Sequence, residues 1–350
     1  MAALLGLDEV GYCTRDMVQR AMSVADIPRL NVRTDQAILA SARDIDGQLQ
    51  RRFFPVYRTM KFDQPSGTNL FLDQYELADV PDQVLSGTAQ MTVDTDVFLR
   101  PRSGPPWRWL EVNYGGSVFW QSVASPQNAI TITGDFGYWL SYVPITTLAS
   151  SATAGASTID VADSSTAGPG ILLEIDQERL IVTDAAQLAT GATLTADLDT
   201  QKSTVAMTVS DGTLLHVGET IYIGTERLLI EGVSGNTVTV RRAISGSVIA
   251  THLSGASITA PRRLTVTRGS CGTLAASHAS ASVVEWQKPP SLITELNIAM
   301  AMNNVMQSLN AYAHTLGKGE SMRQVPGRGV DDLLADAIVR FGRKARHKAV

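Results

Sequence analysis

GETIYIGTERLLIEGVSGNTVTVRRAISGSVIATHLSGA, residues 218–256, predicts a set of β-hairpins. Its aliphatic residues alternate with polar or small neighbours, and the period of two places one face of each strand in a core. The alternating residues are Ile221, Ile223, Leu228, Ile230, Val238 and Val240. Ser-Gly-Asn at 234–236 predicts a tight turn, because Gly and Asn accept the positive φ that such turns need.

The same pattern occurs a second time in the chain. Glu226-Arg227-Leu228 recurs as Glu178-Arg179-Leu180, and TVTVRRAISGSVIATH (237–252) matches RLTVTRGSCGTLAASH (263–278). In both copies an Arg is followed by a Gly four residues later and a His ten residues later. These residues are Arg242, Gly246 and His252 in one copy, and Arg268, Gly272 and His278 in the other. We expect all six to have structural roles in repeated loops.

The spacing of the two copies does not fit a plain tandem duplication. Their front halves lie 48 residues apart, whereas their back halves lie 26 apart. Either a unit at about 203–258 is inserted in a first unit made of 157–186 and 262–284, or the repeats are tandem and the outer ones have decayed. We favour the nested arrangement, because Ser157-Thr158-Ile159 also resembles Ser203-Thr204-Val205.

Length and composition limit the classes of protein to consider. With 350 residues the chain is long enough for two or three domains, and its net charge of −5 argues against a surface that binds nucleic acid throughout. The cysteines, Cys13 and Cys271, support neither a disulfide framework nor a zinc site, so we expect a reducing compartment. We expect no signal peptide and no membrane span.

Helical periodicity is confined to the two ends of the chain. It predicts helices over 15–25 and 34–54, a long helix over about 291–316 and a short one over 330–341. Residues 56–112 read as an antiparallel meander, followed by the strand ITITGDFGYWLSYVP. We therefore predict an α+β fold. Its helical core is formed by both chain ends (1–145, with the meander, and 287–350) and is interrupted by an inserted all-β repeat block over 146–286.

We find no catalytic set and predict neither enzymatic activity nor a cofactor or metal. Gly134-Asp135-Phe136-Gly137 contains the kinase triplet but lacks the other kinase motifs. Two histidines at equivalent positions, His252 and His278, suggest a metal site. They have no Cys or carboxylate at ligand spacing, however, so we expect loop residues bonded to their own backbone. We expect Arg242 and Arg268 to brace a hairpin loop rather than to bind an anion.

Two features of the C-terminal region are candidate contact surfaces. A basic run without acids contains Arg340, Arg343, Lys344, Arg346 and Lys348. It is either a helix end with a solvated tail, or a contact with DNA phosphates or with an acidic partner surface. The Met-rich stripe that contains Met302, Met306 and Leu309 is either core or a subunit interface.

Four segments in this order resemble the head-to-tail adaptor (connector) proteins of long-tailed bacteriophages. They are ILASARDIDGQLQRRFFP, ITITGDFGYW, the helix after PPSLITELNIAMAMNNV, and DDLLADAIVRFG. The β unit also resembles a module common in phage structural proteins. The chain differs from the small connectors in two ways. About 140 residues separate the second and third segments, and Arg242-Ala243 stands where the module usually has Arg-Gly.

The resemblance implies a structural virion protein at the head–tail interface, assembled in the host cytoplasm. It implies a homo-oligomeric ring, expected to be a dodecamer, beneath the portal protein. The ring would extend the channel for double-stranded DNA without sequence specificity, and would dock a tail-side connector, stopper or terminator protein. The alternative function is a tail or baseplate adhesin whose β modules bind glycans. Helices at both chain ends favour the adaptor.

Overall fold

The computed structural model describes residues 10–22, 28–72, 75–309 and 329–343. Its α-helices are α1 (Arg15–Met22), α2 (Pro28–Leu49), α3 (Ser291–Leu309) and α4 (Val330–Phe341). The strands before the repeats are β1 (Val56–Phe62), β2 (Asn69–Phe71), β3 (Gln83–Ser86), β4 (Ala89–Met91), β5 (Val97–Arg100), β6 (Trp109–Val112) and β7 (Ile130–Phe136). The later strands are β8 (Tyr142–Thr147), β9 (Thr158–Asp160), β10 (Leu172–Ile175), β11 (Glu178–Thr193), β12 (Ala206–Thr208), β13 (Thr220–Ile223), β14 (Glu226–Ser234), β15 (Thr237–Arg242), β16 (Ser257–Thr267) and β17 (Val283–Gln287), with a 3-10 turn η1 (Gly212–Leu214) between β12 and β13.

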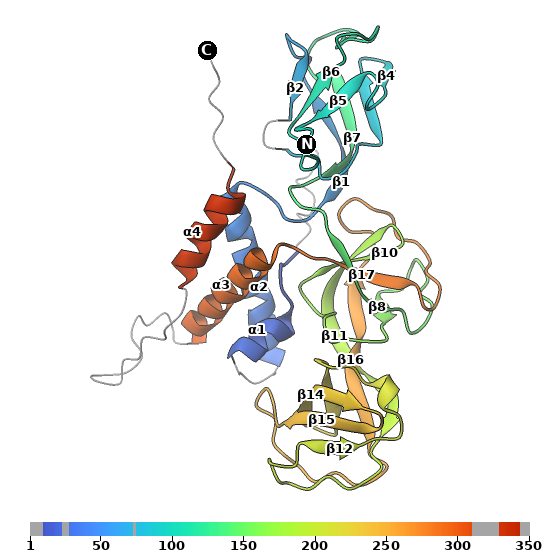
Figure 1. Cartoon of the computed structure of the whole chain (residues 1–350), viewed down its shortest axis with the longest axis vertical. Helices are drawn as coiled ribbons and strands as arrows, with labels where there is room; N and C mark the ends of the chain where they lie inside the picture. Colours follow the sequence, from blue (N-terminus) through green and yellow to red (C-terminus); the bar gives the residue numbers. More distant parts are fainter. Residues whose placement is uncertain (1–9, 23–27, 73–74, 310–328, 344–350) are drawn as a thin grey trace, which may run out of the picture.

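Three β-bodies follow one another along the long axis, and the helices lie beside the middle one (Figure 1). The prediction of an α+β fold with a helical core from both chain ends is therefore wrong. The described part of the chain is mainly antiparallel β-sheet, with one sheet of ten strands and four α-helices. The physical reason is that the alternating segments bury their apolar faces in cores of their own. The helices add a layer at the side of these cores.

The first body, here called the N-terminal β-body, contains β1 to β7. Its strands form two sheets in the orders β1-β7-β3-β4 and β2-β6-β5, with all pairs antiparallel. The predicted meander over 56–112 is wrong in its connectivity, because β1 pairs along its whole length with β7. Side chains from both sheets fill one core, which contains Leu72, Leu110 and Ile132.

The ten-stranded sheet has two separate cores, and each defines a module. Module 1 has the core that contains Ile159, Leu173, Leu264 and Val284. Module 2 has the core made by residues 192–260. Two long strands, β11 and β16, run through both modules and pair with each other, with register shifts where they pass from one to the other. Residues of module 2 are thus flanked in sequence by the two parts of module 1.

The helical layer contains helices from both ends of the chain. A buried amide, Asn297 of α3, holds it together. Its Oδ1 accepts from the backbone N–H of Tyr12 at 3.0 Å, and its Nδ2 donates to the carbonyl of Ile38 at 3.1 Å and the hydroxyl of Ser41 at 2.8 Å. This network fixes α3 against α2, because an unpaired buried amide would cost free energy.

The helix bounds differ partly from the prediction. Helix α2 begins at Pro28 rather than near Thr34, and the hydroxyl of Thr34 donates back to the carbonyl of Leu30. A proline suits the first turn of a helix, since its missing N–H would have no partner there. Helix α2 ends at Leu49, five residues before the predicted end. Helix α4 has the predicted bounds.

Candidate functional site

A buried carboxylate organises the repeated Arg–Gly–His spacing in module 2. Glu226 begins β14, and Arg242 at the end of β15 donates to it from Nε at 2.9 Å and from Nη2 at 2.7 Å. The amide of Ala250 donates to Glu226 Oε2 at 3.0 Å, and Nε2 of His252 lies 2.8 Å from the same oxygen. Glu226 and Arg242 have side chains that are 0% exposed. The cluster thus ties the loop 243–252 to two strands.

Module 1 contains the same cluster at the equivalent positions. Glu178 begins β11, and Arg268 donates to it from Nε and Nη2, both at 2.7 Å. The amide of Ala276 donates at 2.8 Å, and His278 Nε2 lies 2.9 Å from Glu178 Oε2. His278 has a second carboxylate partner, since its Nδ1 lies 2.6 Å from Asp176 Oδ2. The repeated spacing therefore encodes a repeated Glu–Arg–His cluster.

The charges in these clusters are balanced by specific partners. Burial alone would raise the pKa of Glu178, but hydrogen bonds from Arg268, the amides of Ala276 and Gly269, and His278 outweigh it and lower the pKa to about 2. Burial likewise opposes ionisation of Glu226, and its Arg, backbone and His partners lower the pKa below the usual value. Both carboxylates are therefore ionised at neutral pH and serve as fixed acceptors.

The two clusters hold loops of the same backbone conformation. Ala243, Ser245 and Gly246 have φ of 54°, 51° and 73°, and the equivalent Gly269, Cys271 and Gly272 have 58°, 51° and 85°. Several residues with positive φ in one loop cost conformational free energy unless surrounding contacts fix their backbone. The Glu–Arg–His cluster supplies those contacts. The cluster is a loop anchor rather than a catalytic set, because its donors and acceptors satisfy one another.

The anchored loop of module 1 contacts the N-terminal β-body. The carbonyl of Cys271 accepts from the backbone N–H of Tyr57 at 2.8 Å. Gly272 lies so close to β1 that an added Cβ would be 1.9 Å from the carbonyl oxygen of Tyr57. Next to this loop, Arg179 makes a bidentate pair with Asp135 of β7, at 2.6 and 2.7 Å. These contacts join module 1 to the N-terminal β-body.

The Glu-Arg-Leu repeat thus has two roles in each module. Its Glu points inward to the loop anchor, and its Arg points outward to an acid on a neighbouring element. In module 1 that Arg is Arg179, which pairs with Asp135. In module 2 it is Arg227, and the charge of Asp16 on α1 acts on it. Nearby, Arg20 of α1 donates from Nη2 to the Gly218 carbonyl at 2.8 Å. Module 2 is thereby attached to the helical layer.

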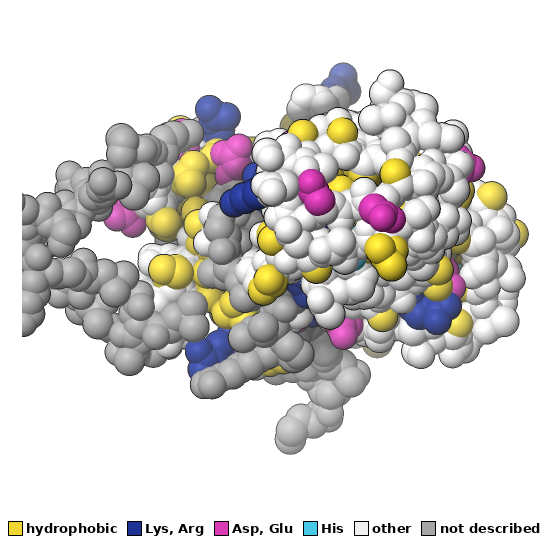
Figure 2. Space-filling model, turned by 90° about the horizontal axis from the view of Figure 1, so that it is seen from below, with side chains coloured by type: hydrophobic (Ala, Val, Ile, Leu, Met, Phe, Trp, Pro, Cys, Tyr) yellow, Lys and Arg dark blue, Asp and Glu magenta, His cyan; other side chains and the backbone are white. Residues whose placement is uncertain are grey.

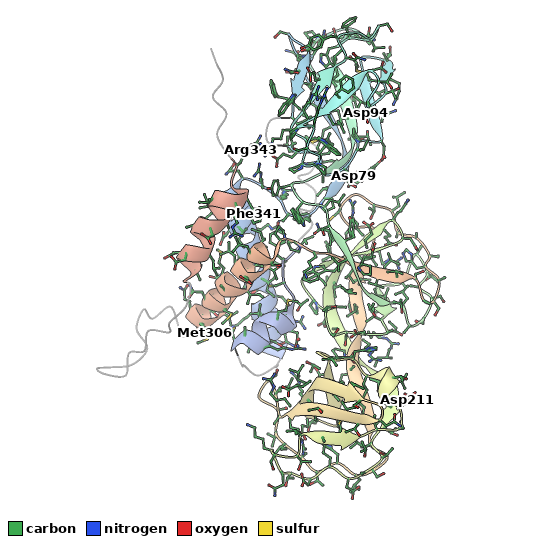
Figure 3. All side chains as sticks on the ribbon, viewed as in Figure 1. Asp79, Asp94, Asp211, Met306, Phe341 and Arg343 are labelled. Carbon is green, nitrogen blue, oxygen red and sulfur yellow. The ribbon has the colours of Figure 1, made fainter. Side chains whose placement is uncertain are left out.

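The structure does not gather the predicted site residues into one place. The six repeat residues divide between the two modules as described. Arg340 is exposed on α4, and the backbone N–H of Arg343 donates to the Leu49 carbonyl at 3.1 Å. Figure 3 labels Phe341 and Arg343 at the end of α4 nearest the N-terminal β-body. Lys344, Arg346 and Lys348 lie outside the described residues.

The methionine stripe of α3 is divided between core and surface. Met302 is half-buried and packs on the cluster that contains Val18 and Val305, whereas Met306 is 40% exposed. Leu309 ends α3, and its side chain lies outside the described part.

Sequence reasoning missed the acids on which these contacts depend. The expectation that His252 and His278 bond their own backbone is replaced by ring contacts with Glu226 and Glu178. A signal for both carboxylates was present, because the Glu-Arg-Leu triplet is repeated with the rest of the pattern. Asp135 gave no such signal, because it lies outside the repeated segments and its partner, Arg179, lies 44 residues away.

Among the described residues, no group of three or more His, Cys, Asp or Glu is placed to hold a metal ion. None of the described helices is both long and apolar enough to cross a membrane. No protein-family model, curated protein or solved structure matches the chain.

Proposed function

We propose that this protein is a head-to-tail adaptor of a long-tailed bacteriophage, located at the head–tail interface of the virion. It would form a homo-oligomeric ring beneath the portal protein, most simply of the portal's twelvefold symmetry. The ring would extend the DNA channel and dock a tail-side connector, stopper or terminator protein. The proposal is supported first by the resemblance of four sequence segments to the phage connector proteins.

The observation that carries the proposal is the outer face of α4. Its inner face is buried in the helical layer through Leu333 and Ala337, whereas Ile338 and Val339 are 46% and 75% exposed beside the exposed Arg340. Exposed aliphatic residues on a firmly packed helix favour contact with another protein surface. A typical partner covers about 800 Å² on each side, so these residues would be the centre of a larger contact.

The charge distribution supports a passage for DNA rather than a surface that holds it. The chain has a net charge of −5, and the free end of module 2 shows mainly uncharged side chains with few basic groups (Figure 2). Each phosphate that a basic residue neutralises adds affinity, so an extended basic surface would retain the duplex. An adaptor has to let DNA slide, and weak contacts suit that task.

Negative-stain electron microscopy of the purified protein, with and without a candidate portal ring, tests the proposal. We expect rings with a central channel, formed alone or on the portal. A charge on the outer face, Val339→Asp, should abolish them. The matched change Val217→Asp, at a residue of module 2 that is 60% exposed, should leave them intact.

A second variant tests the basic segment. Replacing Arg343, Lys344 and Arg346 together by Ala should weaken ring formation or attachment to the portal. Normal assembly of this triple variant would remove the basic segment from the interface. Monomers that also ignore the portal would refute the adaptor function, and selective binding on a glycan array would then support the adhesin.

A further inference from the structure

The histidine of module 1 bridges two acids, whereas the repeated cluster needs only one. Nε2 of His278 lies 2.9 Å from Oε2 of Glu178, the contact that both modules share. Nδ1 of the same ring lies 2.6 Å from Oδ2 of Asp176, in the two-residue turn between β10 and β11. The side chain of His278 is 1% exposed, whereas that of Asp176 is 63% exposed. The ring therefore joins a buried, fixed acid to an acid that can rotate into water.

This bridge requires a hydrogen on both ring nitrogens. An ionised carboxylate only accepts hydrogen bonds, and a neutral imidazole has one N–H donor and one acceptor nitrogen. With a carboxylate at each nitrogen, the ring satisfies both contacts only as the imidazolium cation. The glutamate end has further support, because Arg268 and the amides of Gly269 and Ala276 also donate to it. A ring that loses one hydrogen should therefore keep Glu178 and release Asp176.

The charges in contact around the ring balance when it is a cation. Asp176 and Glu178 face the ring from the β10–β11 turn and from the start of β11, and Arg268, just after β16, pairs with Glu178. Two further segments accompany the ring, its own loop 269–282 and the segment 145–159 that pairs with its backbone. Neither contains a charged side chain apart from the ring itself. One arginine and two acids leave one negative charge, which the imidazolium neutralises.

Module 2 has the same turn without the second acid. Gly224 occupies the position equivalent to Asp176, and the two residues share one left-handed conformation, with φ of 60° and 57°. An acid near this cluster, Asp199, approaches Arg242 instead of the ring, with 3.9 Å between Oδ1 and Nη1. The contact of His252 with its glutamate requires a hydrogen on Nε2 only, which a neutral ring supplies. The two modules therefore form an internal comparison that differs at one position of the turn.

The bridged loop is the one that joins module 1 to the N-terminal β-body. His278 ends the loop in which the carbonyl of Cys271 accepts from the Tyr57 amide. The backbone of His278 also exchanges two hydrogen bonds with Ala152, at 2.8 and 3.0 Å. Loss of the Asp176 contact would release one of the restraints on this loop and so weaken its hold on β1.

We propose that His278 is a pH-dependent latch on the joint between module 1 and the N-terminal β-body. With two hydrogens the ring bridges Asp176 and Glu178 and holds the loop to the β10–β11 turn. As the pH rises and the ring gives up the hydrogen on Nδ1, Asp176 rotates into solvent and only the contact with Glu178 remains. The joint is therefore firmer at low pH than at high pH. The latch rests on these contacts alone and does not require the adaptor function.

NMR titration of the histidine rings in the full chain tests the latch, because the chain has five histidines that single substitutions can assign. His278 should keep both hydrogens to a higher pH than His252. Asp176→Asn should remove this difference, since an amide can donate to Nδ1 of a neutral ring. Gly224→Asp should give His252 the same behaviour, because an added Cβ at 224 has open space around it. The matched control Gly224→Asn has the same shape without the charge and should not.

Hydrogen exchange separates a latch from a ring that titrates without consequence. Protection of the Ala152 and His278 amides, relative to an unstructured peptide at the same pH, should fall by up to about fivefold as the ring titrates. This is the effect of losing one partly exposed ion pair. The equivalent amides of Leu198 and His252, which also pair with each other, should show no such fall. Asp176→Asn should abolish the fall in module 1.

Three results would overturn the proposal. The first is that His278 and His252 lose a hydrogen at the same pH in the wild type. The second is that Asp176→Asn leaves the titration of His278 unchanged; if this variant does not fold, equal titration of His252 in Gly224→Asp and Gly224→Asn counts in the same way. The third is that protection of the module 1 amides stays constant while the ring titrates, which would reduce the bridge to a local contact.

Discussion

Replacing Glu226 by Gln should destabilise module 2 far more than an ordinary loss of one ion pair. The carboxylate of Glu226 accepts from two nitrogens of Arg242, from the Ala250 amide and from the ring of His252. An amide of the same shape has one acceptor oxygen, and its NH2 group would face donors. Arg242, with a side chain that is 0% exposed, would then keep only the exposed carboxylate of Asp199, whose Oδ1 lies 3.9 Å from its Nη1.

The magnitude follows from that burial. Breaking a buried pair by removing one partner costs about 3–5 kcal/mol, because the remaining charge stays in a low dielectric. The chain contains a matched exposed pair, in which Glu231 Oε1 lies 2.9 Å from Arg241 Nε with side chains 46% and 62% exposed. Losing such a pair costs about 0–1 kcal/mol. The two variants Glu226→Gln and Glu231→Gln therefore differ mainly in burial.

Hydrogen exchange of peptides that cover β14 and β15 is a suitable assay, because module 2 contains no tryptophan. At about 1.4 kcal/mol for each factor of ten, Glu226→Gln should reduce protection by about a hundredfold to a few thousandfold. Glu231→Gln should reduce it by less than about tenfold. Equal effects of the two variants would refute the claim that the buried cluster anchors the loop.

Three further outcomes are expected. The pKa of Glu178 is lowered from 4.5 to about 2 in the folded chain, so its stabilising contribution is present above pH 4.5 and is lost as the pH falls toward 2; Glu178→Gln should flatten this loss in acid unfolding curves. Gly272→Ala should separate module 1 from β1, measured as faster exchange of the Tyr57 amide, whereas Gly224→Ala, also at positive φ but with open space around it, should leave that exchange unchanged. Burial raises the pKa of Asp46 from 3.8 to about 6, so the wild type loses stability as the pH rises through this range. The unfolding temperature of Asp46→Asn should therefore rise relative to that of the wild type between pH 4 and 7. A difference that stays constant over this range would contradict the raised pKa of Asp46.

The repeated loops were accessible from the sequence because their spacing is local. Arg242 and His252 lie ten residues apart around one loop, and the same interval separates Arg268 from His278. The division of the β block into its units stays a prediction from this spacing. The ring partners of the histidines were not accessible, since Glu226 lies 26 residues before His252 and meets it only through strand pairing.

The fold class could not be predicted for a related reason. The long apolar stripe over 291–316 is a strong helical pattern and led to the prediction of a helical core. Sheets, in contrast, are built from short segments whose partners can lie far away in the sequence. Strand β1 pairs with β7 across more than sixty residues, from Val56 opposite Phe136 to Phe62 opposite Ile130. Alternation indicates a strand but does not identify its neighbour. For the same reason the joint between Arg179 and Asp135 had no sequence signal.

The two strands that connect the modules have a consequence for how such a protein can change in length. Leu188 of β11 and Ala260 of β16 are direct neighbours across the sheet, so the whole of module 2 leaves and returns to module 1 at adjacent points. Neighbouring strands lie only about 4.8 Å apart. A genetic insertion between these two positions would therefore extend the free end of the molecule and leave the joint of module 1 with the N-terminal β-body in place, whereas a complete excision would also remove Glu219, the partner of Arg262 at 2.7 Å. The length of the module 2 end can therefore change without altering the surfaces of the N-terminal β-body.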